Sequence, residues 1–388
     1  MNDQQRIIAP GSSLGMFGGG QLGRMFAQAA QRLGYRVVVF SDQRDSPAAQ
    51  VVGETIIGDY LDPFAVRKFA EQVDVITLEF ENIAIEAVAR AAETTLVRPG
   101  VKVLAVAQDR VNEKKTLQGL GFPVTPHREV KSLADLASAG QTLGWPLILK
   151  TTKWGYDGKG QRRVSDLIEA QQTFELLGPD PLIAEKWILL RAEVSVIVAR
   201  TPAGAMAVFP MFTNTHANHI LDVTTCPASP ELQAIGKQAE TIALAVGECL
   251  GLEGLLCVEF FVSLDGELMI NEIAPRPHNS GHLTIEACRT SQFEQQVRAI
   301  CNLPLGDTSL IQPAAMANLL GGDWGVERPQ FDRVLQAPST YLHLYGKQDS
   351  RPGRKMGHIT TLSSTAAQAA ELVTTIRDSI RGSKSTLF

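Results

Sequence analysis

The sequence predicts an α/β protein whose first part contains a parallel, doubly wound sheet. Apolar stretches alternate with helical patterns in a βαβα order over the first hundred residues. A glycine-rich turn, GGGQLG, follows the first apolar stretch, as at many strand-to-helix turns of parallel sheets. Farther along, two apolar stretches flank Asp265-Gly266, a turn signal typical of an antiparallel hairpin.

Each element of the first part follows from its own stretch of sequence. Apolar runs predict strands, and segments with helical spacing of apolar residues predict the helices between them. In chain order, we expect a strand at 12–18, a helix at 21–33, a strand at 35–40, a helix at 65–72, a strand at 73–78 and a helix at 85–92.

A second part begins near Asn112, with a short helix that Gly119 and Gly121 stop. The patterns that follow predict a mixture of strands and helices. We expect strands at 146–150, 162–164, 182–186, 193–199 and 205–212, hairpin strands at 255–264 and 267–273, and helices at 166–177 and 230–250. From about residue 312 onward, the sequence predicts short strands, a basic loop and a tail rich in serine and threonine.

The composition is that of a globular protein without a membrane span. Hydrophobic residues make up 44% of the 388 residues, and no apolar run approaches the roughly 20 residues that a bilayer requires. The N-terminal segment lacks the apolar stretch of a signal peptide. Five cysteines without a CxxC pair argue against a disulfide framework, so we expect a cytoplasmic location. The net charge of −5 argues against nucleic-acid binding.

The first glycine-rich turn, at 18–23, lies between a predicted strand and a predicted helix. The backbone amides at such a helix N-terminus can hold a phosphate. Asp42, near the end of the next strand, lies where the ribose-binding acid of a dinucleotide site would be. Three interpretations stay open for this turn: a nicotinamide dinucleotide, another phosphorylated ligand, or packing alone.

The second glycine-rich segment, GYDGKGQ at 155–161, lies between two predicted strands. Its three glycines and its lysine suit a flexible flap whose amides wrap around phosphates. Lys150, at the end of the preceding strand, can reach the same phosphates. The spacing is not that of a Walker A loop. A plain hairpin turn is the alternative.

The hairpin supplies candidate metal ligands. Glu259 and Glu272 lie on its two strands, which are otherwise apolar, so unpaired carboxylates there would be costly to desolvate. Magnesium prefers oxygen ligands and usually takes one or two carboxylates plus nucleotide phosphates. Asn271 can add an amide oxygen. The alternative is a salt bridge between these carboxylates and Arg276.

Two further pairs of glutamates border predicted strands. Glu185 and Glu193 can accept hydrogen bonds from an adenine amino group or from ribose hydroxyls, or they are solvated surface residues. Glu79 and Glu81 end a strand of the first sheet, and ligands of open α/β sheets bind at the carboxyl ends of strands. Capping of the next helix by Glu81 or Asn82 is the alternative.

A stiff loop, APRPHNSGH at 274–282, directly follows the metal strand. Its prolines restrict the backbone, which places Arg276, His278 and Asn279 near whatever the metal activates. The histidine spacing does not indicate zinc, and a purely structural loop is the alternative. A basic cluster near the C-terminus suits a small phosphorylated ligand, and it consists of Lys347, Arg351, Arg354 and Lys355.

Taken in order, these motifs resemble one known family. The series GGGQLGRM, EFEN, LILK, GYDGKGQ, VEFF, NEIAPRPHNSGH and RPGRKMGH is similar to that of the 5-(carboxyamino)imidazole ribonucleotide synthases, ATP-grasp enzymes of bacterial and fungal purine biosynthesis. The resemblance runs from about Gly15 to His358. The sequence departs from the family at Thr213-Asn214, where related sequences often have Glu-Asn, and at His219, which replaces a frequent glycine.

The resemblance implies the domain organisation. We expect a Rossmann-like pre-ATP-grasp domain that does not bind nicotinamide, an ATP-grasp core of two α+β lobes, and a small C-terminal domain. The first lobe of the core would carry the flap and the second the metal site. In this sequence the four segments would be 1–112, 113–186, 187–311 and 312–388. A homodimer is expected from the family alone.

The resemblance also implies the residues that bind each ligand. Magnesium would be held by Glu259 and Glu272. The 5-aminoimidazole ribonucleotide, with its single 5′-phosphate, would be bound by Gln21, Leu22, Glu79, Asn279, Lys347, Arg354 and Lys355. ATP would be bound by Arg110, Lys150, Gly155, Tyr156, Asp157, Gly158, Lys159, Gly160, Gln161, Glu185, Lys186, Trp187, Ile188, Glu193, His216, Asn271 and Glu272.

The reaction that the resemblance implies is the ATP-dependent carboxylation of 5-aminoimidazole ribonucleotide to 5-carboxyaminoimidazole ribonucleotide. Bicarbonate would attack the γ-phosphate of ATP and give carboxyphosphate and ADP. The exocyclic amine of the ribonucleotide would then capture carboxyphosphate, or carbon dioxide released from it in the closed site. Asp157 would accept or orient a proton, while Arg276 and His278 would grip the bicarbonate. Closure of the flap would exclude water.

Three other functions fit parts of the sequence. Another ATP-grasp ligase, such as formate-dependent glycinamide ribonucleotide transformylase, would share every nucleotide-binding residue. A nicotinamide-dependent oxidoreductase would use the first glycine-rich turn and Asp42. A non-catalytic nucleotide-sensing scaffold would keep the ATP site without the chemistry.

Overall fold

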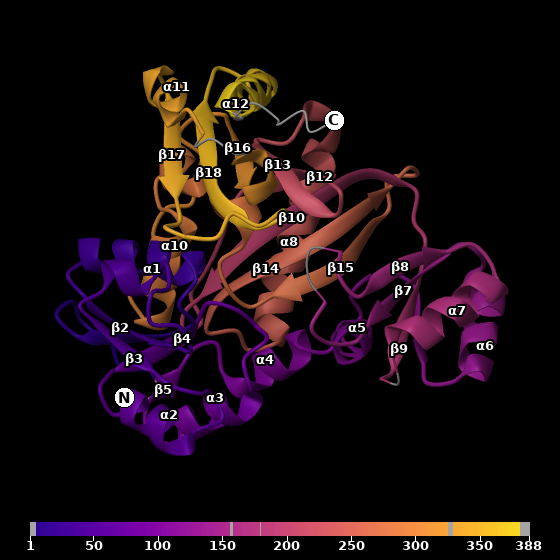
Figure 1. Ribbon diagram of the computed structural model, residues 1–388, viewed down its shortest axis with the longest axis horizontal. Coiled ribbons are helices and arrows are strands. Elements are labelled where there is room, and N and C mark those ends of the chain that lie inside the picture. The colour runs from indigo at the N-terminus through magenta and orange to yellow at the C-terminus, as the bar shows by residue number, and fades with distance from the viewer. Residues whose placement is uncertain (1–4, 156–157, 179, 325–328, 381–388) are drawn as a thin grey trace.

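The computed structural model describes residues 5–155, 158–178, 180–324 and 329–380. Within these residues the strands form three sheets, of five, four and nine strands. In Figure 1 the five-stranded sheet lies at the lower left, the four-stranded sheet at the lower right, and the nine-stranded sheet between and above them. No described helix is long and apolar enough to cross a membrane.

The first hundred residues form a parallel sheet with the strand order β3-β2-β1-β4-β5. The elements here are β1 (Ser13–Phe17), α1 (Gln21–Arg32), β2 (Arg36–Ser41), β3 (Glu54–Ile57), α2 (Pro63–Ala70), β4 (Val75–Leu78), α3 (Ile85–Ala92), β5 (Leu96–Val97) and α4 (Val101–Ala107). Every residue of the central strand β1 is buried, as expected for a parallel sheet covered on both faces. The predicted doubly wound sheet is confirmed. The sequence prediction missed β3 and β5, which are not fully buried and therefore show no clear apolar run.

The four-stranded sheet is antiparallel, with the order β6-β9-β7-β8. This region contains α5 (Arg110–Gly119), β6 (His127–Val130), α6 (Leu133–Leu143), β7 (Leu147–Thr151), β8 (Gln161–Val164), α7 (Leu167–Leu177) and β9 (Leu182–Lys186). Leu147 and Leu149 of β7 belong to the core that α6 and α7 complete. Because side chains alternate along a strand, Ile148 and Lys150 face the other side, where a cavity lies.

The nine-stranded sheet runs through the second half of the chain, in the order β15-β14-β10-β12-β13-β16-β18-β17, with β11 paired to β10. Its strands are β10 (Leu190–Arg200), β11 (Met206–Val208), β12 (Phe212–Ala217), β13 (Ile220–Cys226), β14 (Gly254–Ser263), β15 (Leu268–Ala274), β16 (Ala314–Leu320), β17 (Thr340–Leu344) and β18 (Lys355–Leu362). The helices of this half are α8 (Gln233–Cys249), α9 (Thr284–Ala287), α10 (Gln292–Ile300), α11 (Phe331–Gln336) and α12 (Ala366–Ile380). Strand β16 pairs with β13, so the sheet continues across the boundary expected near residue 311.

Three local predictions were wrong. The hairpin loop has three residues rather than two, because the N–H of Ser263 still donates to the carbonyl of Glu267 at 3.0 Å, and Gly266 takes the positive φ that such a loop needs. The strand expected at 205–212 is split between β11 and β12, with Pro210, which has no N–H to donate, in the gap. Much of the expected tail is the helix α12.

Candidate active site

A large cavity of about 1310 Å³ lies where the three sheets meet. It gathers the predicted site residues that the structure describes, except Gly160, while Tyr156 and Asp157 lie outside the described residues. The predicted residues that line it are Gln21, Leu22, Glu79, Arg110, Lys150, Gly155, Gly158, Lys159, Gln161, Glu185, Lys186, Trp187, Ile188, Glu193, His216, Glu259, Asn271, Glu272, Arg276, His278, Asn279, Lys347, Arg354 and Lys355.

The first glycine-rich turn holds a carboxylate of the protein itself. Glu79, directly after β4, accepts hydrogen bonds from the backbone N–H groups of Gly20 and of Leu22, the second at 3.0 Å. A Cβ at Gly20 would clash with the Glu79 carboxylate, so this close approach requires glycine. Burial raises the pKa of Glu79, although the backbone hydrogen bonds oppose the shift. A dinucleotide phosphate at this helix N-terminus would have to displace a buried carboxylate.

The two cations predicted for the ATP phosphates are each paired with a glutamate. Arg110, at the start of α5, forms an ion pair with Glu272, and Lys150 Nζ lies 2.7 Å from a Glu185 oxygen. Burial alone would raise the pKa of each glutamate, but the neighbouring cations outweigh it and lower both pKa values to about 2. Both carboxylates are therefore ionised at neutral pH, and Arg110 and Lys150 line the cavity.

A buried charged network beneath these pairs was not predicted. Lys114 is 1% exposed, donates hydrogen bonds to two backbone carbonyls of β15 and lies 3.9 Å from Glu185. Glu113 accepts a hydrogen bond from the backbone N–H of Ile273 at 3.0 Å, and burial raises the pKa of Glu113 to about 8. Helix α5 thus bonds to strand β15 on both sides of Glu272. In the sequence, the charged run at 112–115 looks like a solvated helix face.

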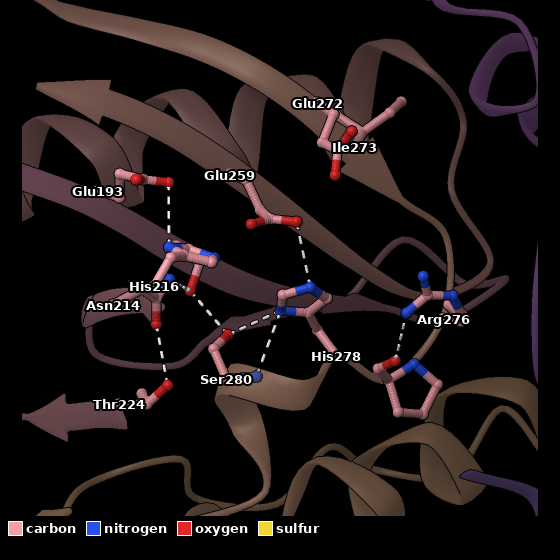
Figure 2. A network of polar contacts seen from close by, with 12 residues as sticks. Glu193, Asn214, His216, Thr224, Glu259, Glu272, Ile273, Arg276, His278 and Ser280 are labelled. Atoms are coloured by element: carbon pink, nitrogen blue, oxygen red, sulfur yellow. Dashed lines mark hydrogen bonds and ion pairs between the residues drawn. The ribbon is translucent and has the colours of Figure 1, made fainter. Parts of the chain in front are cut away.

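The hairpin glutamates lie directly opposite each other. The register pairs Glu259 of β14 with Glu272 of β15, so both side chains share one face (Figure 2). A register shift after Glu259 leaves Asn271 as an extra residue, and such a bulge re-aims side chains, so that Asn271 lines the cavity beside Glu272. Within the described part of the chain, the buried Oδ1 of Asn271 has no hydrogen-bond partner.

These three side chains suit a magnesium ion. Two carboxylates on one face and an unsatisfied amide oxygen are hard ligands of the kind that magnesium takes. The described residues contain no group of three or more His, Cys, Asp or Glu side chains placed to hold a metal by themselves. Magnesium does not require such a group, because it usually keeps several water molecules and binds nucleotide phosphates.

Arg276 is paired with Glu81 rather than with the hairpin glutamates. Its guanidinium donates two hydrogen bonds to the Glu81 carboxylate, one of them at 3.0 Å. Burial opposes ionisation of Glu81, but Arg276 lowers its pKa below the usual value. The alternative prediction, a salt bridge between Arg276 and the hairpin glutamates, is therefore wrong. Glu81 also caps no helix, because α3 begins after Ala84, which makes no side-chain capping bond in the described structure.

His278, in the loop that follows the hairpin, lies against Glu259 of β14 (Figure 2). Its Nε2 is 3.1 Å from Glu259, and its Nδ1 is 2.8 Å from the hydroxyl of Ser280. Burial would lower the pKa of His278, but the nearby Cys257 and Glu259 outweigh it and raise the pKa to about 10. The raised pKa favours the protonated ring, which suits binding of an anion better than accepting a proton.

Further residues predicted to bind ATP also line the cavity. The segment 186–188 joins β9 to β10 and lines the cavity. Glu193 lies 3.2 Å from Nδ1 of His216, and although burial opposes it, this interaction raises the pKa of His216. His219, where the sequence departs from the family, also lines the cavity and lies so close to Gly158 that a Cβ on the glycine would clash with it.

Cations also gather beside Glu79. Lys347 is close enough to Glu79 to oppose the rise in the pKa of this carboxyl group. Lys347 also donates a hydrogen bond to the carbonyl of Lys355 at 2.8 Å. Arg354 and Lys355 line the same part of the site. Asn279 is only partly exposed, yet among the described residues neither atom of its amide has a partner. A buried amide without partners is costly, so we expect a ligand to satisfy it.

Family models match three successive parts of the chain. The ribonucleotide synthetase preATP-grasp domain matches residues 12–108, the ATP-grasp domain matches 115–293, and the phosphoribosylaminoimidazole carboxylase C-terminal domain matches 314–372. The fold and the site thus define a protein of the ATP-grasp class, as the sequence predicted. The domain boundaries given above stay predictions.

Relatives that span the whole chain narrow this class. The N5-carboxyaminoimidazole ribonucleotide synthase of Bacillus subtilis (strain 168) is 43% identical over 356 residues, covering 92% of this chain and 93% of that protein. The N5-carboxyaminoimidazole synthetase of Staphylococcus aureus, solved with ADP, has a TM-score of 0.90 and 36% identity, covering 97% of this chain and 100% of that chain. The Aspergillus clavatus synthase, solved with ADP and 5-aminoimidazole ribonucleotide, has a TM-score of 0.86 and 32% identity, with coverage of 95% and 98%. The chain belongs to the N5-carboxyaminoimidazole ribonucleotide synthase family.

Proposed function

We propose that this protein carboxylates 5-aminoimidazole ribonucleotide to N5-carboxyaminoimidazole ribonucleotide at the expense of ATP, in purine biosynthesis, with bicarbonate as the carbon source and magnesium as the metal. One observation carries the proposal. The same cavity joins cations suited to a polyphosphate, Arg110 and Lys150, with cations suited to a monophosphate, Lys347, Arg354 and Lys355. A relative of this family was solved with ADP and the ribonucleotide together.

The first step is transfer of the γ-phosphoryl group of ATP to bicarbonate. Arg110 and Lys150, fixed by their glutamates, neutralise charge on the phosphates as the bond to the leaving ADP breaks. Glu259, Glu272 and Asn271 would hold magnesium, which when bound neutralises phosphate charge further. The products are carboxyphosphate and ADP.

The second step joins the carboxyl group to the ribonucleotide. Arg276, oriented by Glu81, and His278, oriented by Glu259, hold the bicarbonate and then the carboxyphosphate as cations. The exocyclic amine forms a bond to the carboxyl carbon, the bond to phosphate breaks, and inorganic phosphate leaves while the amine loses one proton. We assign the proton to Asp157 on the flap.

The ribonucleotide is held at the edge of the first sheet. Lys347, Arg354 and Lys355 bind its 5′-phosphate, Glu79 accepts hydrogen bonds from the ribose, and the unpartnered amide of Asn279 completes the site. This assignment explains why the first glycine-rich turn holds a carboxylate, since a sugar needs an acceptor there. We also propose a homodimer in a reducing cytoplasm. The free thiols of all five cysteines, each among the described residues, support the second point.

The test is release of ADP by the purified protein with Mg-ATP and defined second substrates. We expect release that requires both bicarbonate and 5-aminoimidazole ribonucleotide, with one carboxylated product formed for each ADP. Glycinamide ribonucleotide with formate is the matched comparison. Stimulation by that pair instead would overturn the proposal in favour of the transformylase, and ATP binding without turnover on either pair would favour the nucleotide-sensing scaffold.

A further inference from the structure

Behind the cavity, a line of polar side chains connects His278 to the interior of the large sheet. Nδ1 of His278 lies 2.8 Å from Ser280 Oγ, which lies 2.7 Å from Ser195 Oγ. Nδ2 of Asn214 donates to Ser195 Oγ at 2.9 Å, and the hydroxyl of Thr224 donates to Oδ1 of Asn214 at 3.0 Å. Figure 2 shows both ends of this line, which we call the polar chain: Ser280, Ser195, Asn214 and Thr224.

The polar chain is buried and built on several elements. Ser280, in the turn η4 (Asn279–Gly281), and Ser195 and Thr224 are 0% exposed, and Asn214 is 6% exposed. Ser195, Asn214 and Thr224 lie on the adjacent strands β10, β12 and β13. Buried polar groups are costly unless they are hydrogen-bonded, and apolar side chains would pack the same space without that cost. Their presence therefore calls for a role beyond holding the sheet together.

The geometry ties this chain to the hairpin carboxylate. Ser195 is the register partner of Glu259 on the neighbouring strand. The imidazole of His278 therefore lies between Glu259, which contacts Nε2, and the polar chain, which contacts Nδ1. Gln292 holds the backbone of His278 through two hydrogen bonds, at 2.9 and 2.8 Å, but it does not fix the direction of the ring. The backbone N–H of Ser280 also donates to Nδ1, but at 3.4 Å, so the 2.8 Å contact with the Ser280 hydroxyl is the closer one at this nitrogen.

We propose that Ser280, Ser195, Asn214 and Thr224 are positioning residues that hold the His278 ring in the orientation that the carboxylation requires. Either hydroxyl of the two serines can be donor or acceptor, so the contacts persist whether or not Nδ1 carries a proton. The kinetic part of the proposal rests on the proposed function. The structural part, the orientation of the ring, does not.

The kinetic test uses Ser280→Ala, which cuts the polar chain at the ring. We expect kcat for carboxylation to fall by about 10- to 100-fold, as when the orienting partner of an active-site ligand is removed. The KM values for ATP and for the ribonucleotide should change by less than about twofold, because the side-chain hydrogen bonds described above run within the polar chain and to His278, not to the predicted ATP- or ribonucleotide-binding side chains. The number of ADP molecules released per carboxylated product should rise. Ser280→Thr, which keeps the hydroxyl, should restore most of kcat.

Asn214→Asp tests the chain at a distance from the ring. It keeps the shape of the side chain but replaces the donor to Ser195 by an acceptor, and we expect kcat to fall by several-fold to about tenfold. The matched control is Asn318→Asp. Asn318 is 1% exposed on β16, and its amide donates to the carbonyl of Leu221 at 2.7 Å, outside the polar chain. The control should lower the thermal midpoint comparably and leave kcat unchanged.

A crystal structure of Ser280→Ala separates this inference from the proposed function. We expect the His278 ring to turn so that Nε2 is no longer within hydrogen-bond distance of Glu259. A ring that stays in place, or a loss of kcat in Asn318→Asp equal to that in Asn214→Asp, would overturn the inference. If the wild-type protein does not carboxylate the ribonucleotide, the proposed function fails, and the ring orientation alone then supports or overturns the positioning role.

Discussion

The two glycine-rich turns look alike in the sequence but have different neighbours in the structure. At the first turn, the amides bind the carboxylate of Glu79. Beside the second turn lie two cations, Arg110 and Lys150, and the guanidinium of Arg110 is 3.4 Å from the carbonyl of Gly155. A glycine-rich turn therefore does not specify a phosphate site by itself. At the first turn, the end of the neighbouring strand β4 supplies the anion, which is Glu79.

The largest expected effect comes from removing a cation beside the second turn. Lys150→Ala should lower kcat/KM for ATP by about 10²- to 10³-fold, because it removes a cationic side chain held close to the phosphoryl group that is transferred. It also leaves Glu185 buried without its nearest partner. Steady-state ADP release at saturating ribonucleotide measures the effect, and Lys68→Ala, on the exposed face of α2, is the control. A loss below about fivefold would show that the second turn does not depend on this cation.

The next prediction concerns Glu113 in helix α5, the helix that carries Arg110 beside the second turn. Burial raises the pKa of Glu113 to about 8 from the ordinary 4.5. A raised pKa means that the folded protein binds the proton more tightly, so this stabilisation is complete below about pH 4.5 and is lost as the pH rises through about 8. Relative to Glu113→Gln, which cannot ionise, the wild type should lose about 2 to 4 kcal/mol of unfolding free energy over that range.

Denaturant unfolding of both proteins at several pH values provides the measurement. Glu113→Gln is the reference for the wild type, because the two proteins share all other titrating groups. Parallel pH profiles for the two proteins would contradict the buried, protonated state of Glu113.

A smaller effect is expected from adding a side chain to a glycine of the first turn. Gly20→Ala places a methyl group against the Glu79 carboxylate, and such overpacking typically costs about 1 to 3 kcal/mol of unfolding free energy. The KM for the ribonucleotide should rise, while the KM for ATP should not. Gly53→Ala is the matched control, because a Cβ there would have no atom within 4 Å among the described residues. Equal destabilisation by the two substitutions would argue against the tight approach of Glu79.

The smallest effect distinguishes the ligands of the two turns. Mg-ATP should raise the thermal midpoint of the wild type, whereas NAD should leave it unchanged, because the anion position at the first turn is taken. Differential scanning fluorimetry with each ligand provides the comparison. A shift with NAD similar to that with Mg-ATP would revive the oxidoreductase interpretation.

The residues that share a local motif could be predicted from the sequence. Two glycine-rich turns, the hairpin glutamates and the loop after them each lie within a short stretch, and the structure places them around the same cavity. Pairings between distant stretches could not be predicted. Glu81 and Arg276 are 195 residues apart, and nothing local to either one indicates the other. Single serines and asparagines on strands, such as Ser195 and Asn214, carry no pattern at all.

The fold shows the same division between strong and weak local signals. The buried strands β1, β2 and β4 are apolar runs, and the sequence predicted all three. The edge strand β3 is only partly buried, so it lacks a clear apolar run, and the prediction missed it. The charges of α5 indicate solvent exposure, and their burial depends on partners in β15 and β9 that local sequence does not reveal.

A crystal structure with Mg-ADP tests most directly which glycine-rich turn serves the nucleotide. We expect the diphosphate beside Arg110 and Lys150, with the metal in contact with Glu259 and Glu272 and with Glu79 still bound to the amides of the first turn. A diphosphate at the N-terminus of α1, with Glu79 displaced, would contradict it.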